Sequence, residues 1–138
     1  MTDCLFCKIA KKEIPAAIFY EDSKTVSFLD IKPHSLGHSV VILKNHSENI
    51  LDTNENDLSS LFSAVKKTIA ILQKALSPSG FTIGINHGEI AGQVIKHLHI
   101  HIIPRYQDDK GGSIHSVVFN PPKESVNETL TKILNSNF

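Results

Sequence analysis

HLHIHII, residues 97–103 of this 138-residue chain, alternates histidine with aliphatic side chains. Successive side chains of a β-strand point to opposite faces of its sheet. We therefore expect a strand over residues 95–103, with its aliphatic side chains in a core and with His97, His99 and His101 in a row on the other, solvent-facing side. Neighbouring rings of that row lie about 6.5–7 Å apart, because a strand rises about 3.3 Å per residue.

Three imidazoles at this spacing disfavour one another's protonation. From an ordinary pKa of about 6.5, at least one ring should therefore stay neutral near pH 7. A neutral imidazole is a competent nucleophile toward phosphorus, and the middle ring, His99, is the candidate. Two alternatives stay open: a three-histidine metal site, although successive positions on a straight strand converge poorly on one ion, and histidines that are simply satisfied within the core.

The loop before this strand, NHGEIAGQ over residues 86–93, has the composition of an anion site. Its two glycines allow the backbone to approach a ligand closely, and Asn86 and Gln93 carry amide donors. A phosphate held there would lie beside the candidate nucleophile.

The rest of the chain predicts an α+β domain, in which an antiparallel sheet carries helices on one face. Strands are expected over residues 17–21, 25–30, 38–43, 81–87 and 95–103, the last stopped by Pro104, and helices over 4–11, about 54–77 and near the C-terminus. The long helix is marked by an apolar stripe of Leu58, Leu61, Phe62, Val65, Ile69, Leu72 and Leu76.

Charge and hydropathy exclude several classes of function. Lys+Arg and Asp+Glu both number 14, so the formal net charge is zero and no global field attracts bulk nucleic acid or an anionic membrane. No signal-peptide pattern and no apolar run long enough to span a bilayer is present, so we expect a soluble, cytoplasmic protein. With 138 residues, 41% of them hydrophobic, the chain suits one domain.

The two cysteines, Cys4 and Cys7, are separated by two residues. In a reducing compartment this spacing indicates metal or redox chemistry and not a structural disulfide. The alternative is a pair of reduced thiols without a metal.

The motif over residues 97–103 resembles the signature of the histidine-triad (HIT) family, His-φ-His-φ-His-φ-φ with φ apolar. The similarity covers roughly residues 4–106 and is closest to the Hint-like bacterial branch, formerly called protein kinase C-interacting proteins. Further matches are CLFCKI at residues 4–9, EIPA at 13–16, FLDI at 28–31, His38, Asn86 and Gly92-Gln93.

The resemblance implies a HIT-like fold: a five-stranded antiparallel sheet with one long and one or two short helices, joined across a homodimer into a ten-stranded sheet. We accordingly expect a HIT domain over residues 4–109 and a C-terminal extension, residues 110–138, packed on that domain.

The resemblance also implies a purine nucleoside monophosphate, or its phosphoramidate, bound with its α-phosphate at the triad, and no organic cofactor. His99 would attack the phosphorus and form a nucleotidyl-histidine that water hydrolyses. His101 and His38 would support that ring, and His97 would help to position the strand.

Further positions match the family's nucleotide site. Asp30 matches an acid that binds the ribose, and the other positions are Phe6, Ile9, Phe28 and Ile31 around the nucleoside, and Asn86, Gly92, Gln93, Val94, His99 and His101 around the phosphate. The four apolar residues around the nucleoside are alternatively ordinary core. Val94 departs from the Ser, Thr or Glu of many members, so it has no hydroxyl to donate to the phosphate or the leaving group.

Many bacterial members bind structural zinc through a cysteine pair and two histidines. These positions match Cys4, Cys7, His46 and His97, so we expect a zinc site there. His34, His87 and His115 receive no role and are interpreted as loop or surface residues.

Nucleoside 5'-phosphoramidate hydrolysis is the first functional hypothesis. The second is a dinucleoside polyphosphate hydrolase, as in the fragile-histidine-triad branch. The third is a nucleotide-binding scaffold protein in which turnover is incidental.

Overall fold

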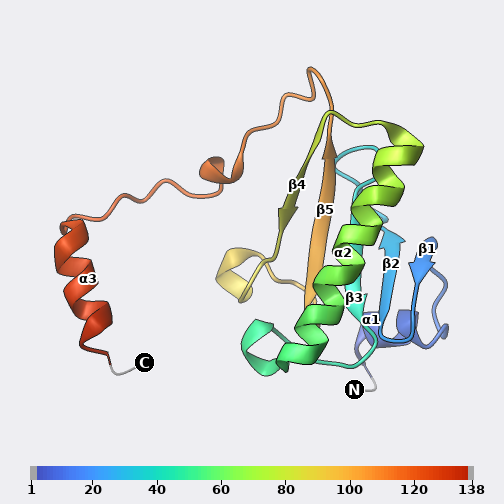
Figure 1. The fold of residues 1–138 in the computed structure, drawn as a ribbon, viewed down its shortest axis with the longest axis horizontal. Coiled ribbons are helices and arrows are strands. Elements are labelled where there is room, and N and C mark those ends of the chain that lie inside the picture. The colour runs from blue at the N-terminus through green and yellow to red at the C-terminus, as the bar shows by residue number, and fades with distance from the viewer. Residues whose placement is uncertain (1–2, 137–138) are drawn as a thin grey trace.

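Five strands form one antiparallel sheet in the order β1-β2-β3-β5-β4, as the computed structural model of the chain shows for residues 3–136 (Figure 1). The strands are β1 (Ile18–Glu21), β2 (Thr25–Leu29), β3 (Ser39–Leu43), β4 (Gly80–Gly84) and β5 (His99–Arg105). The predicted α+β class and the five-stranded antiparallel sheet are confirmed.

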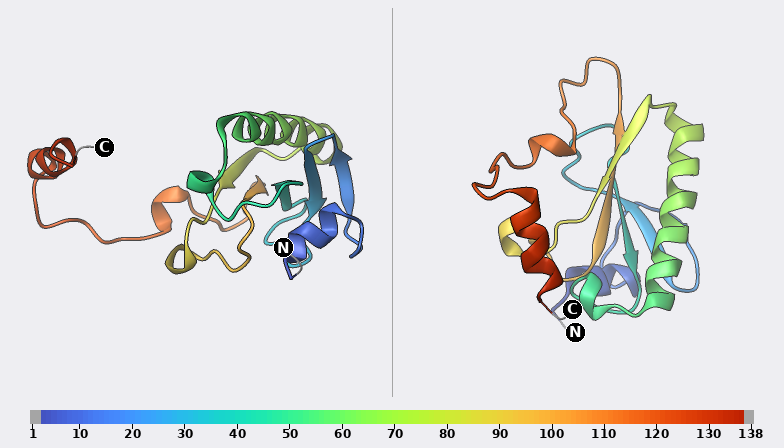
Figure 2. Two further views of the ribbon diagram at one scale, coloured as in Figure 1. Left: turned by 90° about the horizontal axis from the view of Figure 1, so that it is seen from below. Right: turned by 60° about the vertical axis from the view of Figure 1, so that its left-hand side comes forward.

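Helices cover both faces of the sheet, so the prediction of helices on one face is wrong. Viewed from below, α2 (Glu55–Leu76) lies on one side of the strands and α1 (Leu5–Ala10) on the other (Figure 2). The reason is that α1 buries Phe6, Cys7 and Ile9 and needs an apolar partner of its own. None of the described helices is long and apolar enough to cross a membrane.

The long helix α2 begins and ends where capping chemistry allows. The Asn54 side chain accepts the N–H of Asp57, and Ser77 closes the helix in the left-handed conformation, with a φ of 50°. Phe62, expected on the buried stripe, is half exposed, whereas Thr68 is buried and shares a 2.6 Å hydrogen bond with Ser27.

The histidine side of β5 is not open to solvent, because the sheet has two cores. Leu98, Ile100 and Ile102 pack toward α2, as the alternation predicts. The opposite face carries a second core under α1, formed by Phe6, Ile9, Val26, Phe28, Val40 and Ile42. As a result His97 is fully buried and His99 is only 7% exposed.

The boundaries of β5 differ from the predicted ones at both ends. The ladder begins at His99, paired with Ile42, since the preceding Leu98 donates its N–H to Ser47 outside the sheet. The strand continues through Pro104, which pairs only with β4 because pairing with β3 ends at Ile102. A proline is tolerated where a strand has a single neighbour.

The described part of the C-terminal extension, residues 110–136, contains one short 3₁₀ turn and one helix. Three short 3₁₀ turns, η1 (Ile50–Asp52), η2 (Glu89–Ala91) and η3 (Ile114–Ser116), interrupt the loops, and the last lies in this extension. From there the chain runs past the β4 edge to α3 (Val126–Leu134), which stands apart from the sheet in both figures (Figures 1 and 2). Apolar side chains of the extension are exposed, among them Ile114, Val117, Val118 and Phe119.

Candidate active site and metal centre

Antiparallel pairing brings the histidines of distant segments together. His101 of β5 pairs with Val40 of β3, so His38, just before β3, lies beside it. The two rings are 5.2 Å apart between centroids, and His99 and His101 are 5.0 Å apart. His38, His99 and His101 therefore form one group on the α1 side of the sheet.

The His99 ring is oriented by the main chain of the same segment. Its Nδ1–H donates to the carbonyl oxygen of His97 at 2.7 Å. A carbonyl only accepts, so Nδ1 must carry the proton, and Nε2 of the neutral ring keeps its lone pair. The Phe6 ring packs against His99 at 5.1 Å in an edge arrangement. His99 thus presents one unprotonated nitrogen in a defined direction.

The His38–His101 pair is oriented from its other end. The backbone N–H of His34 donates to Nδ1 of His38 at 3.1 Å, so neutral His38 carries its proton on Nε2. That Nε2–H donates to Nδ1 of His101 at 3.0 Å. The neutral His101 ring therefore carries its own proton on Nε2 and can donate it in a hydrogen bond.

Asp30, directly after β2, is the acid nearest these rings. One carboxylate oxygen lies 3.6 Å from His38 Nε2 and 4.0 Å from His101 Nδ1, and the other accepts the N–H of Lys32 at 2.9 Å. Asp30, His38 and His101 form a cluster of metal-ligating groups. However, a neutral imidazole has only one nitrogen with a free lone pair, and in His38 that nitrogen is Nδ1, which accepts the His34 N–H. His38 Nε2 therefore carries a proton and has no lone pair for a cation, so this tautomer opposes metal binding there.

The three buried rings and the partly buried His101 all favour the neutral form. Burial lowers the pKa of His97 to about 4 and, together with His99 and His38, the pKa of His101 to about 4. Burial also lowers the pKa values of His99 and His38, while the Asp30 carboxylate acts in the opposite direction. The neutral state required for an unprotonated Nε2 is therefore the state that burial favours.

The glycine-bearing loop is held by Gln93 in a way that differs from the prediction. Its side-chain amide donates to the carbonyls of Glu48 at 2.8 Å and Ile95 at 3.2 Å, and its Oε1 accepts the N–H of Gly88. Gln93 therefore shapes the loop, and its amide hydrogens are already donated. Gly88 and Gly92 have φ values of 91° and 103°, which favour glycine.

The residues matched to the nucleoside site divide into buried and exposed sets. Phe6, Ile9 and Phe28 belong to the second core, and the Phe6 ring also touches His99. Ile31 and Val94 are 88% and 89% exposed.

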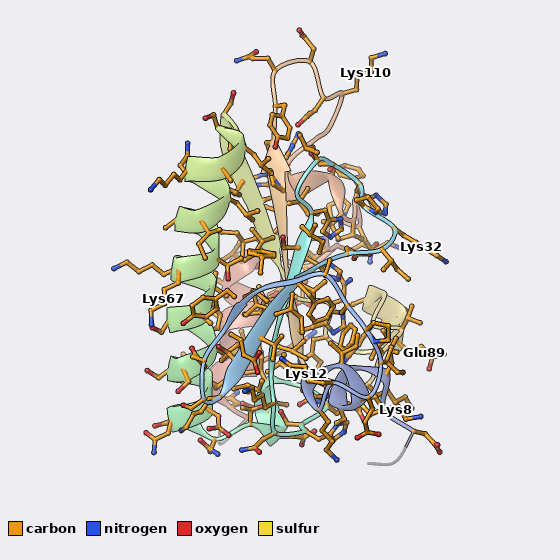
Figure 3. The ribbon with its side chains drawn as sticks, turned by 90° about the vertical axis from the view of Figure 1, so that its right-hand side faces the viewer. Lys8, Lys12, Lys32, Lys67, Glu89 and Lys110 are labelled. Carbon is orange, nitrogen blue, oxygen red and sulfur yellow. The ribbon has the colours of Figure 1, made fainter. Side chains whose placement is uncertain are left out.

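Charged side chains around this face carry both signs. Lys8, Lys32 and Glu89 project from the side of the molecule away from α2, where Lys67 lies (Figure 3). This mixed rim is not a strongly basic surface.

The four residues expected at a zinc site lie together. His97 Nδ1 is 3.3 Å from Cys4 Sγ, 3.5 Å from Cys7 Sγ and 3.2 Å from His46 Nδ1. Tetrahedral zinc with Zn–N of about 2.0–2.1 Å and Zn–S of about 2.3 Å separates two nitrogens by roughly 3.3 Å and a sulfur and a nitrogen by roughly 3.5 Å. The cluster has the dimensions of such a site.

The protonation of these groups also suits a cation. His97 donates its Nε2–H to the carbonyl of Leu43 at 2.8 Å, which leaves the Nδ1 lone pair facing the thiols. Burial beside Cys4 raises the pKa of Cys7, so a bound cation is what would ionise this thiol near neutral pH.

Sequence reasoning missed the groups that orient the rings. The backbone N–H of His34 and the carbonyls of Leu43 and His97 determine which nitrogen of each histidine carries the proton. Main-chain groups leave no residue-type signal, and so His34 received no role. Only the fold reveals them.

A HIT-domain family model matches residues 11–108, and the chain belongs to the HIT family. It is 44% identical over 106 residues to an uncharacterized HIT-like protein of Methanocaldococcus jannaschii, covering 77% of this chain and 81% of that protein. An adenosine 5'-monophosphoramidase of Schizosaccharomyces pombe is 36% identical over 78% of each chain. An adenylylsulfatase of Arabidopsis thaliana is 40% identical over 78% of this chain and 54% of its own length.

Solved structures agree with this assignment. A HIT family protein from Bacillus anthracis superposes with a TM-score of 0.84 at 35% identity, covering 97% of this chain and 94% of that one. A Zn-bound histidine triad family protein from Mycobacterium smegmatis has a TM-score of 0.73 at 33% identity, covering 89% and 85%. The predicted HIT fold is confirmed.

The low pKa of His101 predicts acid destabilisation. An unfolded histidine takes up its proton near pH 6.5, whereas in the folded protein the pKa of His101 is about 4. Between these values the unfolded state binds more protons, so this ring lowers the free energy of unfolding as the pH falls, by up to about 3 kcal/mol. Urea unfolding of His101→Asn at several pH values should show a weaker decline than that of wild type. The exposed-site control His115→Asn should keep the wild-type slope, and an unchanged slope in His101→Asn would contradict the assignment.

Proposed function

We propose that the protein hydrolyses nucleoside 5'-phosphoramidates through a nucleotidyl-His99 intermediate. The observation that carries the proposal is the 2.7 Å bond from His99 Nδ1–H to the His97 carbonyl, which leaves Nε2 of a neutral ring free to attack. Two relatives whose names describe activities on adenylyl compounds, the phosphoramidase and the adenylylsulfatase, support this choice of substrate.

In the first step His99 Nε2 forms a bond to the α-phosphorus, and the P–N bond of the substrate breaks. The departing amine keeps the electron pair and takes a proton from solvent. His101 Nε2–H donates a hydrogen bond to a phosphoryl oxygen and stabilises its developing charge. The modified His99 ring is then cationic, because Nδ1 still carries its proton, and the His97 carbonyl stabilises that charge.

In the second step water attacks the phosphorus and releases a proton to solvent, the P–N bond to His99 breaks, and its electrons return to His99 Nε2. Overall one water is consumed, and a nucleoside monophosphate and an amine are released. Burial suits this chemistry because it keeps competing protonation of the ring low. Val94 has no hydroxyl to donate to the phosphate, so we assign His101 as the side-chain donor to the phosphoryl oxygen.

Incubation with an adenylated amine tests the proposed intermediate. Intact mass should show wild type heavier by one adenosine monophosphoryl group, and His99→Ala should show no adduct and lose at least about 10³-fold in kcat/KM. The matched control His87→Ala removes an exposed histidine from a neighbouring loop and should retain the adduct.

Faster turnover of diadenosine polyphosphates than of phosphoramidates would favour the polyphosphate-hydrolase alternative. An unmodified His99 during turnover would overturn the covalent mechanism. A biological phenotype that survives His99→Ala would support the scaffold hypothesis instead.

We also propose that Cys4, Cys7, His46 and His97 hold one structural zinc ion. The ligand separations and the free Nδ1 lone pair of His97 support this site, and the M. smegmatis relative is Zn-bound. When bound, the ion would crosslink the N-terminal segment to the chain before β5 and would take no part in hydrolysis.

Metal analysis tests the zinc site. Purified protein should contain one zinc per chain, and Cys7→Ser should contain little and unfold at a Tm lower by more than about 5 °C. A chelator should lower the wild-type Tm toward that of the variant. Metal-free wild-type protein whose Tm does not respond to added zinc would contradict the proposal.

We also propose that the protein is a homodimer, and two features support this. In the described sheet β4 is an edge strand, paired only with β5, and open edges pair readily with another chain. The extension leaves on this side with Val117, Val118 and Phe119 exposed (Figure 1). A second copy paired at β4 would form the ten-stranded sheet and could cover these side chains.

Truncation tests the role of the extension in this dimer. Light scattering should give twice the chain mass for full-length protein, and deletion of residues 113–138 should weaken association at least about 10-fold. The triple change Val117, Val118 and Phe119 to Ser should act in the same direction. A full-length monomer at high concentration would contradict the dimer.

A further inference from the structure

His97 belongs to the cluster of candidate metal ligands, and its carbonyl oxygen also bonds the His99 ring. This connection extends the role of the proposed metal site beyond stability. Resting on the proposed function, we infer that the Cys4–Cys7–His46–His97 centre positions the nucleophile, so that metal loss misorients His99 without removing the nucleotide site.

The first link is His97, which faces both sites. Its imidazole Nδ1 points at the thiols of the cluster, while Nε2–H is bonded to Leu43. Its carbonyl oxygen is the acceptor that orients His99 at 2.7 Å. A ligand bond to the His97 side chain therefore restrains the residue whose main chain sets the tautomer and direction of His99.

The second link runs through the loop of the exposed ligand, His46. The peptide group between His97 and Leu98 supplies the carbonyl to His99, and its N–H donates to the carbonyl of Ser47 at 2.8 Å. Ser47 directly follows His46. Fixing the His46 ring in the cluster thereby also restrains the plane of that peptide group.

The third link is Phe6, which lies between the two cysteine ligands in α1. Its ring is 5.1 Å from that of His99 and 6.0 Å from that of His97. Helix α1 has only six residues, too few to be stable by itself. A crosslink through Cys4 and Cys7 would hold α1, and with it the ring that packs on the nucleophile.

The sheet does not replace these links. Pairing of β5 with β3 begins at His99, so it holds the backbone of the nucleophile but not the carbonyl of His97. The orientation of the ring depends on groups outside the ladder, and in the described structure each of them leads back to a residue of the cluster.

Paired substitutions at His46 test the inference, because this ligand is exposed. His46→Ala removes a ligand, and His46→Cys supplies a thiolate that can restore a zinc site. The first readout is the exchange rate of the His99 Nδ1–H proton in ¹⁵N-histidine-labelled protein, which needs no turnover. The second is the single-turnover rate of His99 nucleotidylation, compared with the Kd for adenosine monophosphate.

In His46→Ala we expect the exchange of His99 Nδ1–H to accelerate and nucleotidylation to slow, each by about 10-fold or more, which is the size expected for loss of one orienting hydrogen bond. The Kd for adenosine monophosphate should stay within about 2-fold of the wild-type value. Added zinc should rescue His46→Cys, and His115→Ala should resemble wild type. The inference is overturned if wild-type protein contains no zinc. It is also overturned if a metal-free variant keeps the wild-type rates of Nδ1–H exchange and nucleotidylation. Zinc-dependent protection of Nδ1–H without any adduct in wild type would support the positioning role and reject the proposed function.

Discussion

The hydrogen bond from His99 Nδ1–H to the His97 carbonyl is the interaction on which the rest of the site depends. An imidazole nitrogen that bonds a main-chain group must take the complementary role, because an N–H only donates and a carbonyl only accepts. This one contact sets where the proton lies, which nitrogen is available and which way it points. The reactivity we propose for His99 is a consequence of backbone geometry.

The same logic applies to the neighbouring rings. The His34 N–H determines the tautomer of His38 and, through it, that of His101, while the Leu43 carbonyl determines that of His97. Identical residue types two positions apart thereby acquire different tasks: His97 faces Cys4, Cys7 and His46, His99 offers a lone pair and His101 offers a proton. Burial on the α1 side of the sheet keeps these rings neutral, at the cost of stability in acid.

Much of this fold follows from local patterns in the sequence. The apolar periodicity over residues 54–77 predicts α2, and the alternation of HLHIHII correctly separates Leu98 and Ile100 from the histidines. Alternation alone does not reveal where a ladder starts, since His97 continues the pattern although pairing begins at His99. Phe62 fits the helical stripe and is nevertheless half exposed, because burial depends on what packs opposite.

The site could be predicted only where side-chain type carries the signal. The cysteine pair, His46 and His97 come together as the family resemblance implies. Gln93 appeared to be a ligand donor, but its amide is used to shape the loop, a role that depends on carbonyls brought in by the fold. The apolar pattern near the C-terminus predicts a helix, observed as α3, but amphipathicity does not specify which surface that helix will cover.

Assignment of the imidazole tautomers in solution tests the central claim most directly. Long-range ¹H–¹⁵N correlation spectra of histidine-labelled protein near neutral pH distinguish a ring protonated at Nδ1 from one protonated at Nε2. We expect His99 to be neutral with its proton on Nδ1, and His101 to be neutral with its proton on Nε2. A His99 ring that is protonated at Nε2, or charged, would contradict an attack by that nitrogen.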